Sequence, residues 1–268
     1  MQLTPWSQLV ALVATAWAVA AALQLALWAV QQRTRNAGIV DVGWALAFTP
    51  VVAVFAWRAS TPISVWGPIA AAVAVWSLRL GGYLIARGAA GGHEEGRYAD
   101  LRRRWGDRAP RRFFVFFQAQ AALVGLLSVA FAAPFVAAPR DAGLLRAAGV
   151  AIAILAIAGE AIADAQLARW KRDPARGAVC DVGLWGWSRH PNYFFEWCYW
   201  LGLAVYGLAF APLGLVALAG QAIILASILG VTGIPPTEAQ AVRSKGDAYR
   251  AYQRRVSKFV PWPPRRSA

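Results

Sequence analysis

The chain has few of the residues that build disulfides, metal centres or acidic surfaces. It has two cysteines, Cys180 and Cys198, without a CxxC spacing, and two histidines, His93 and His190. No structural disulfide or metal site is expected, because the cysteines lack the CxxC spacing and the histidines are too few for the usual zinc sites. Acidic residues are also scarce: 13 Asp and Glu stand against 27 Lys and Arg, which gives a formal net charge of +14.

Long polar segments are missing as well. The longest, residues 88–112, has about 25 residues, fewer than the roughly 40 at which small domains begin to fold unaided. Because 59% of the residues are hydrophobic, the basic and apolar parts must be segregated, as they are in a membrane protein. We therefore expect a single membrane domain over residues 1–268, with a C-terminal cytoplasmic tail at about 238–268.

Seven apolar stretches are long enough to cross a bilayer, which takes about 20 residues in a helix. They predict an all-α, polytopic integral membrane bundle with helices at about 8–30, 38–57, 65–86, 113–133, 144–167, 193–210 and 213–232. The first stretch has no basic segment before it and exceeds the apolar core of a signal peptide, so we expect a retained helix.

The basic residues predict how this bundle is oriented. With the N-terminus outside, only Arg58 and Arg140 lie in outer loops, Arg79 and Arg146 lie within predicted spans, and every other Lys and Arg faces the cytoplasm. This asymmetry is the positive-inside pattern of membrane proteins. We therefore expect an external N-terminus and a cytoplasmic C-terminus.

Charged residues within or beside the predicted spans mark a candidate site. Each of them would cost about 2.5–3.5 kcal/mol at a helix centre facing lipid, so they must face a protein interior or a cavity; they are Asp41, Arg79, Glu160, Asp164 and Glu196. Interhelical salt bridges, for example from Arg79 to Asp41 or Asp164, are one interpretation. The other is a cytoplasmic cavity for an anionic nucleotide, because Arg suits phosphate oxygens.

The basic loops beside these charges allow the same two kinds of partner. They suit either nucleotide phosphates or the anionic headgroups of membrane lipids. The sequence has no GxGxxG or Walker motif, so any nucleotide would be held without a Rossmann or P-loop device. We expect no nucleic-acid partner.

Several motifs resemble those of a membrane superfamily. Residues 183–197 read GLWGWSRHPNYFFEW, and Glu238, GDAYRAY at 246–252 and FVP at 259–261 follow them. This pattern resembles the superfamily of steroid 5α-reductases, sterol reductases and isoprenylcysteine carboxyl methyltransferases. The DVGW at 41–44 and the RYADLR at 97–102 further resemble a bacterial group of membrane proteins classed with the steroid 5α-reductases.

The resemblance implies an NADPH-dependent reductase of the bacterial inner membrane. Such an enzyme moves a hydride to a C=C bond conjugated with a carbonyl, here in a lipophilic, steroid- or polyprenoid-like substrate that enters from the bilayer. Carried over to this chain, the cofactor-binding residues would be Arg79, Asp164, Arg169, Arg172, Arg189, His190, Asn192, Tyr193 and Glu196.

The proton donor departs from the reductase pattern. The steroid enzymes use a Glu on an early helix and a Tyr three residues before the conserved Arg, but here Trp76 stands three residues before Arg79. Trp cannot serve as that proton donor. We predict Tyr83, one turn after Arg79, as the catalytic substitute, with Asp41 as its partner if burial keeps it protonated. The alternatives are an interfacial role for Tyr83 and an Asp41–Arg79 ion pair.

Two rival functions remain open. Methyltransferases of the superfamily share the Arg-His-Pro-x-Tyr turn and a later glutamate, here Glu238, and use S-adenosylmethionine. That cofactor is not a polyanion and would not call for Arg79, Arg169 and Arg172 near the pocket. The methyltransferases also commonly have a Gly soon after the Tyr, where this chain has Phe194 and Phe195. A non-enzymatic, lipid-binding protein would instead pair Asp164, Asn192 and Glu196 internally.

Overall fold

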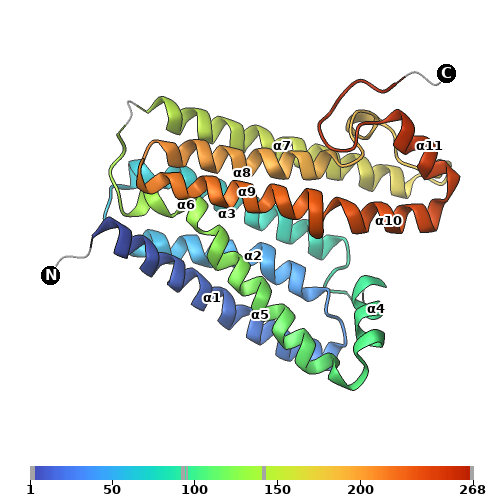
Figure 1. The fold of residues 1–268 in the computed structure, drawn as a ribbon, viewed down its shortest axis with the longest axis horizontal. Helices are drawn as coiled ribbons and strands as arrows, with labels where there is room; N and C mark the ends of the chain where they lie inside the picture. The colour runs from blue at the N-terminus through green and yellow to red at the C-terminus, as the bar shows by residue number, and fades with distance from the viewer. Residues whose placement is uncertain (1–3, 92–93, 95, 141–142, 266–268) are drawn as a thin grey trace. The chain divides into compact units, whose positions relative to one another are not determined.

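The computed structural model describes residues 4–91, 94, 96–140 and 143–265. Across these residues the regular structure is helical, apart from an isolated bridge between Ser188 and Ser257. The chain forms two compact units (Figure 1). The N-terminal unit comprises Met1–Arg146 and Tyr206–Gly220, and the C-terminal unit comprises Ala147–Val205 and Gln221–Ala268. The helices confirm the predicted all-α, polytopic membrane fold.

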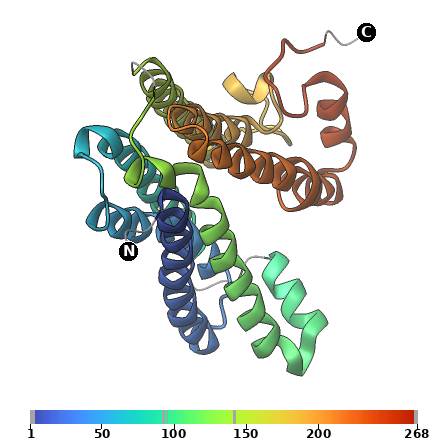
Figure 2. The same cartoon turned by 60° about the vertical axis from the view of Figure 1, so that its left-hand side comes forward.

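The N-terminal unit is built on four long helices that pack side by side. Helix α1 contacts α5 and α2, and α2 contacts α3 (Figure 1, Figure 2). A Cβ atom on Gly125 of α5 would lie 2.8 Å from the Trp17 Cβ of α1, so a side chain at Gly125 would force these helices apart. The helices of this unit are α1 (Pro5–Thr34), α2 (Ile39–Trp57), α3 (Ile63–Ala86), α4 (Gly96–Trp105), α5 (Ala109–Leu127) and α6 (Val129–Ala132).

Aromatic side chains fill the core of the N-terminal unit. The Trp76 ring is fully buried, with its centroid 5.3 Å from that of Phe48 and 5.9 Å from that of Trp44. Both pairs meet edge to face, a geometry that adds about 0.5–1.5 kcal/mol per pair beyond area burial. Trp76 therefore packs in the core between α2 and α3.

The C-terminal unit holds most of α7 (Leu144–Arg172) and of α8 (Pro191–Leu208), the end of α9 (Ala217–Ala226), α10 (Ile234–Lys245) and α11 (Asp247–Arg255). Small residues let α7 and α8 approach closely. A Cβ atom on Gly202 would lie 2.7 Å from the Gly149 carbonyl oxygen and 2.8 Å from the Ala153 nitrogen. Such contacts are typical of helices packed in lipid. Much of the predicted tail at 238–268 is helical: it contains most of α10 and all of α11.

Among the described residues, six helices or helical runs are long and apolar enough to cross a membrane, where the sequence predicts about seven. They are Pro5–Thr34, Ile39–Trp57, Ile63–Ala86, Gly96–Phe135, Leu144–Arg172 and Leu213–Lys245. The stretch predicted at 193–210 does form a helix, α8, of 18 residues. Asn192, Glu196 and several Trp and Tyr rings lower its mean hydropathy, so length and composition alone do not mark α8 as a span.

The close approach of α7 and α8 at Gly202 can be tested by substitution. Gly202→Ala places a methyl group against rigid backbone, which should cost about 1–3 kcal/mol of the free energy of unfolding and lower the thermal midpoint in detergent. Gly82→Ala in α3 is the control, because its Cβ meets nothing within 4 Å and Ala favours helix. If Gly202→Ala is as stable as Gly82→Ala, the packing described for α7 and α8 is wrong.

Candidate functional site

The motif at 183–197 forms a tight turn that leads into α8. Gly183 has a positive φ of 56°, which Gly adopts without a steric penalty. The Leu184 amide then donates to Gln166 Oε1 at 2.9 Å, and Trp185 Nε1 donates to the Ala163 carbonyl at 2.9 Å. Both acceptors lie on α7, so the turn is anchored to that helix before Pro191 begins α8.

The later motifs hold this turn from the other side. The Tyr252 hydroxyl of α11 donates to the Trp185 carbonyl at 2.6 Å, and the Ser188 hydroxyl donates to the Phe259 carbonyl at 2.7 Å. The Arg189 amide donates to the Ser257 carbonyl at 2.8 Å. The sequence motifs that follow one another across about 80 residues are thus parts of one hydrogen-bonded structure.

Arg189 and Glu238 form a largely buried ion pair within this structure. Arg189 Nε donates to Glu238 Oε1 at 2.6 Å, and the two side chains are 9% and 14% exposed. Arg189 Nη1 also donates to the carbonyls of Gln253 and Val256, at 3.0 and 2.7 Å. One guanidinium therefore ties the start of α8 to α10 and to the end of α11, a role that suits Arg's planar fork of donors.

Glu238 accepts hydrogen bonds from several other side chains. Gln253 Nε2 donates to its Oε2 at 3.0 Å, and the Tyr249 hydroxyl donates to its Oε1 at 3.5 Å. Sequence reasoning named Glu238 as part of a motif but gave no role to it, to Tyr249 or to Gln253. The sequence does contain a signal for Glu238. A buried arginine needs an acidic partner, and Glu238 is a glutamate that follows Arg189 in the motif.

His190 faces the same carboxylate. Its Nε2 lies 3.2 Å from Glu238 Oε1, and its ring stacks on Tyr193 with the centroids 5.6 Å apart and the planes inclined by 5°. Burial lowers the pKa of the His190 imidazole below its ordinary value, although the Glu238 carboxylate opposes that shift. At neutral pH, therefore, His190 is a neutral ring that orients Tyr193.

Polar side chains meet where α7 faces the start of α8. Asp164 and Glu160 on α7 are buried. Asn192 Nδ2 donates to Asp164 Oδ1 at 3.5 Å, and the Tyr193 hydroxyl lies 3.4 Å from Thr237 Oγ1 of α10. Glu196 accepts a hydrogen bond from Trp200 Nε1 at 2.8 Å. The C-terminal unit therefore brings together five predicted cofactor residues, Asp164, Arg189, His190, Asn192 and Tyr193, and it also contains a sixth, Glu196, further along α8.

Two other predicted residues, Arg169 and Arg172, lie at the C-terminal end of α7. Both are exposed, and within the part of the chain that the structure describes, neither guanidinium donates a hydrogen bond or pairs with an acid. Cations are favoured at this end of a helix dipole. Arg169 and Arg172 thus present unused donors of the kind that bind phosphate.

The remaining predicted residues belong to the N-terminal unit. Asp41 near the start of α2 pairs with Arg97, and its Oδ1 accepts a hydrogen bond from the Tyr98 hydroxyl at 2.8 Å. Arg79 and Tyr83 lie on α3, where the Arg87 guanidinium carbon is 6.0 Å from the Tyr83 ring centroid. The Asp41–Arg97 ion pair is a contact of the ionised carboxylate, which accepts hydrogen bonds and has no proton to donate.

The fold and these sites define a polytopic helical membrane protein with a polar, hydrogen-bonded site in its C-terminal unit. The family model described as "Protein of unknown function (DUF1295)" matches residues 27–256, and the chain belongs to this family. No curated protein and no solved structure matches the chain. The matched region includes every predicted site residue.

The Arg189–Glu238 pair gives a direct test of this site. Arg189→Met leaves Glu238 without its main partner, and breaking a buried pair costs about 3–5 kcal/mol, so the thermal midpoint in detergent should fall markedly. Arg250→Met is the matched control: its pair with Asp247 is exposed, with side chains 56% and 96% accessible, and such pairs contribute little. Equal midpoints for the two variants would show that Arg189 does not hold the turn.

Proposed function

We propose that this protein is a membrane-embedded, NADPH-dependent reductase of a C=C bond in a lipophilic enone. One observation carries the proposal. Helix α7 holds the buried Asp164 against Asn192 at the start of α8, and it ends in the exposed guanidinium groups of Arg169 and Arg172, which have no partner among the described residues. A buried carboxylate and a part-buried carboxamide, with exposed arginines about one to two turns further along α7, suit a ligand that carries both amide or hydroxyl groups and several phosphates.

The residues present fit NADPH by the chemistry of their donors and acceptors. Arg169 and Arg172 would bind the pyrophosphate and the additional phosphate, because guanidinium groups pair bidentately with phosphate. Asn192 and Asp164 would hold the amide or ribose hydroxyl groups. Bound there, the cofactor would supply the hydride. The resemblance of the family's motifs to those of the steroid 5α-reductases supports the same reaction class.

The remaining residues of the C-terminal unit would act by positioning. Arg189 uses its Nε and Nη1 on Glu238 and two carbonyls, so we assign it to holding the turn rather than to direct cofactor contact. His190 is neutral at pH 7 and stacks on Tyr193. This stack would fix the Tyr193 ring, leaving its hydroxyl for Thr237 or for a ligand.

For proton donation to the substrate carbonyl we retain Tyr83. A phenol can donate a hydrogen bond to a developing enolate, whereas Asp41 is paired as a carboxylate with Arg97. We assign Asp41 to holding the start of α4 through Arg97 and Tyr98. The substrate is an apolar enone that enters from the bilayer, of the steroid or polyprenoid type.

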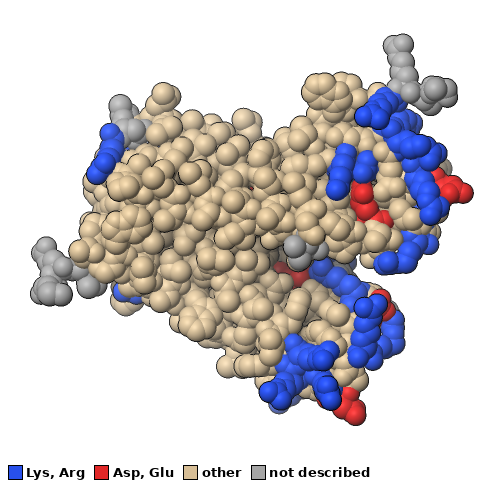
Figure 3. All heavy atoms as spheres, in the orientation of Figure 1, with Lys and Arg blue, Asp and Glu red and all other residues tan. Residues whose placement is uncertain are grey.

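The distribution of charge supports an inner-membrane location with a cytoplasmic C-terminus. Most of the Lys and Arg side chains visible in Figure 3 gather at one end of their unit, over α4 and the start of α5 in one unit and over α11 in the other. The positive-inside rule assigns such ends to the cytoplasm. The N-terminus of α1, at the opposite end from the basic residues Arg33 and Arg35, would then lie outside.

An S-adenosylmethionine-dependent methyltransferase is the second candidate. The observation that favours it is the direct contact of Glu238 with Arg189 and His190, since the methyltransferases of the superfamily share these elements. The unpaired Arg169 and Arg172 favour the polyanionic NADPH. A lipid-binding, non-enzymatic protein would also show the internal Asp164–Asn192 and Glu196–Trp200 hydrogen bonds, so cofactor binding must decide.

Titration of the purified protein with NADPH, NADH and S-adenosylmethionine tests the proposal. The protein should bind NADPH. Arg172→Ala should lower the affinity for NADPH about ten- to hundred-fold, because a hydrogen bond to a charged group contributes about 1.5–3 kcal/mol. Arg254→Ala is the matched control, because Arg254 is an exposed arginine at the end of α11.

Three outcomes would count against this assignment. Equal NADPH affinity in the wild-type protein and in Arg172→Ala would remove Arg172 from the site. Binding of S-adenosylmethionine instead of NADPH would favour the methyltransferase, and binding of neither would favour the non-enzymatic protein.

A further inference from the structure

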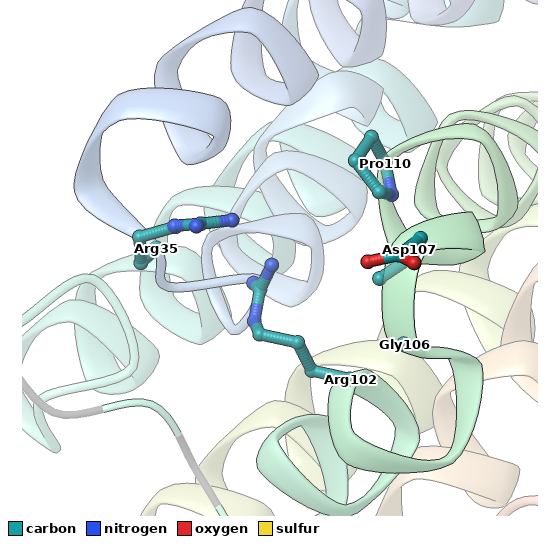
Figure 4. A pocket seen from close by; sticks show the side chains of 6 residues that line it. Arg35, Arg102, Gly106, Asp107 and Pro110 are labelled. Carbon is teal, nitrogen blue, oxygen red and sulfur yellow. The ribbon is translucent and has the colours of Figure 1, made fainter.

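A hollow at one end of the N-terminal unit takes no part in the proposed reaction. Its volume is about 540 Å³, within the range of roughly 300–1,000 Å³ typical of ligand sites. It lies where the end of α1, the end of α4 and the start of α5 meet (Figure 4). Its lining consists of Arg35, Arg102, Gly106, Asp107, Ala109 and Pro110.

Arg102 is held rigidly at the edge of this hollow. Its Nε and Nη2 donate to the two carboxylate oxygens of Glu94, at 3.0 and 2.7 Å, and Nη2 also donates to Gln31 Oε1 at 3.2 Å. The guanidinium carbon lies 4.7 Å from the Phe113 ring centroid. Nη1 donates no hydrogen bond within the described residues, and Figure 4 shows the guanidinium directed between Arg35 and Asp107.

The Glu94 partner keeps this arrangement charged at neutral pH. Burial alone would raise the pKa of the Glu94 carboxyl, but hydrogen bonds from Arg102 and from the Ala37 amide, together with the charge of Arg102, lower it overall. Arg102 therefore has a fixed position before any ligand arrives, which reduces the entropy cost of binding.

Arg35 supplies a second guanidinium to the hollow. It ends α1 in the left-handed conformation, with φ of 56°, at a position where Gly or Asn is usual because other side chains are strained there. Its side chain is exposed and has no hydrogen-bond or ion-pair partner among the residues that the structure describes. In Figure 4 it reaches across the hollow toward Arg102.

Asp107 adds a charge of the opposite sign. It is exposed, carries no ion pair within the described chain, and lies across from Arg102 (Figure 4). A simple phosphate ion would meet two guanidinium groups but also a repelling carboxylate. A ligand with a phosphate and a nearby ammonium group suits all three side chains, because the phosphate would meet Arg35 and the open Nη1 of Arg102 while the ammonium group would meet Asp107.

The surroundings indicate that this ligand belongs to a lipid. Pro110 and Phe114 are one turn apart on α5, and residues that far apart lie on one helix face. Phe114 and Val115 are exposed apolar residues, 38% and 60% accessible, and the Phe114 ring packs edge to face on Trp28 of α1. An acyl chain leaving the hollow past Pro110 would meet this apolar surface.

We propose that the hollow binds a phosphoethanolamine headgroup, with its phosphate on Arg35 and Arg102 and its ammonium group on Asp107. Membrane phosphatidylethanolamine is the favoured source, and water-soluble phosphoethanolamine is the other source of the same chemistry. The site is independent of the proposed reductase activity, because none of its three charged residues belongs to the predicted cofactor or catalytic set.

The test measures thermal unfolding of the purified full chain in a neutral detergent. The midpoint is titrated separately with phosphatidylethanolamine, phosphatidylglycerol, phosphatidylcholine, soluble phosphoethanolamine and inorganic phosphate. A ligand that binds the folded state raises the midpoint with concentration. Phosphatidylethanolamine should bind most tightly among the lipids. Stabilisation by soluble phosphoethanolamine at equal concentration would instead assign the site to a soluble ligand of the same chemistry.

Three variants separate this site from general charge attraction. Arg35→Gln should weaken the binding of phosphatidylethanolamine about tenfold or more. Arg33→Gln removes the same charge from a nearby exposed position outside the hollow and should leave this binding unchanged. Asp107→Asn should remove the preference for phosphatidylethanolamine over phosphatidylglycerol. The proposal is overturned if the wild-type protein shows no such preference, if Arg33→Gln matches Arg35→Gln, or if inorganic phosphate binds as tightly as phosphoethanolamine.

Discussion

The ion pair between Arg189 and Glu238 holds the C-terminal unit's site together. A buried charge is costly unless it is paired and its remaining hydrogen-bonding groups are satisfied. Arg189 donates hydrogen bonds to Glu238 and to the carbonyls of Gln253 and Val256. Glu238 also accepts hydrogen bonds from the side chains of Gln253 and Tyr249. The turn before α8, helix α10 and helix α11 are consequently fixed to one another, and His190 and Tyr193 take their orientation from them.

The helices were largely predictable, because each depends on a local run of apolar residues. Helix α2 ends at Trp57 as predicted, and α3 ends at Ala86. Helix α8 was predicted as a helix too, but Asn192 and Glu196, which help to make the site, also lower its hydropathy. Polar residues that build a site lower the hydropathy of the helix that carries them. Composition therefore predicts membrane spans least well for the helices that form the site.

The side-chain partners were less predictable, because pairing depends on tertiary packing and not on local sequence. The charge of Asp164 within a predicted span and the motif that contains Asn192 both indicated a polar site. The structure places these two residues in contact in the C-terminal unit. Asp41, however, pairs with Arg97, 56 residues away, a partner that the span pattern did not suggest. The hollow at Arg35 and Asp107 was also unforeseen, because both residues look like ordinary solvated charges in the sequence.

The central claim is that the arginines at the end of α7 serve a phosphate-rich cofactor held beside Asp164 and Asn192. The most direct measurement is mass spectrometry of the small molecules released from the protein after gentle purification in detergent. The account predicts NADPH or NADP⁺ in the released fraction, in amounts that fall when Arg172 is replaced. Recovery of S-adenosylmethionine or its demethylated product in its place would contradict the account.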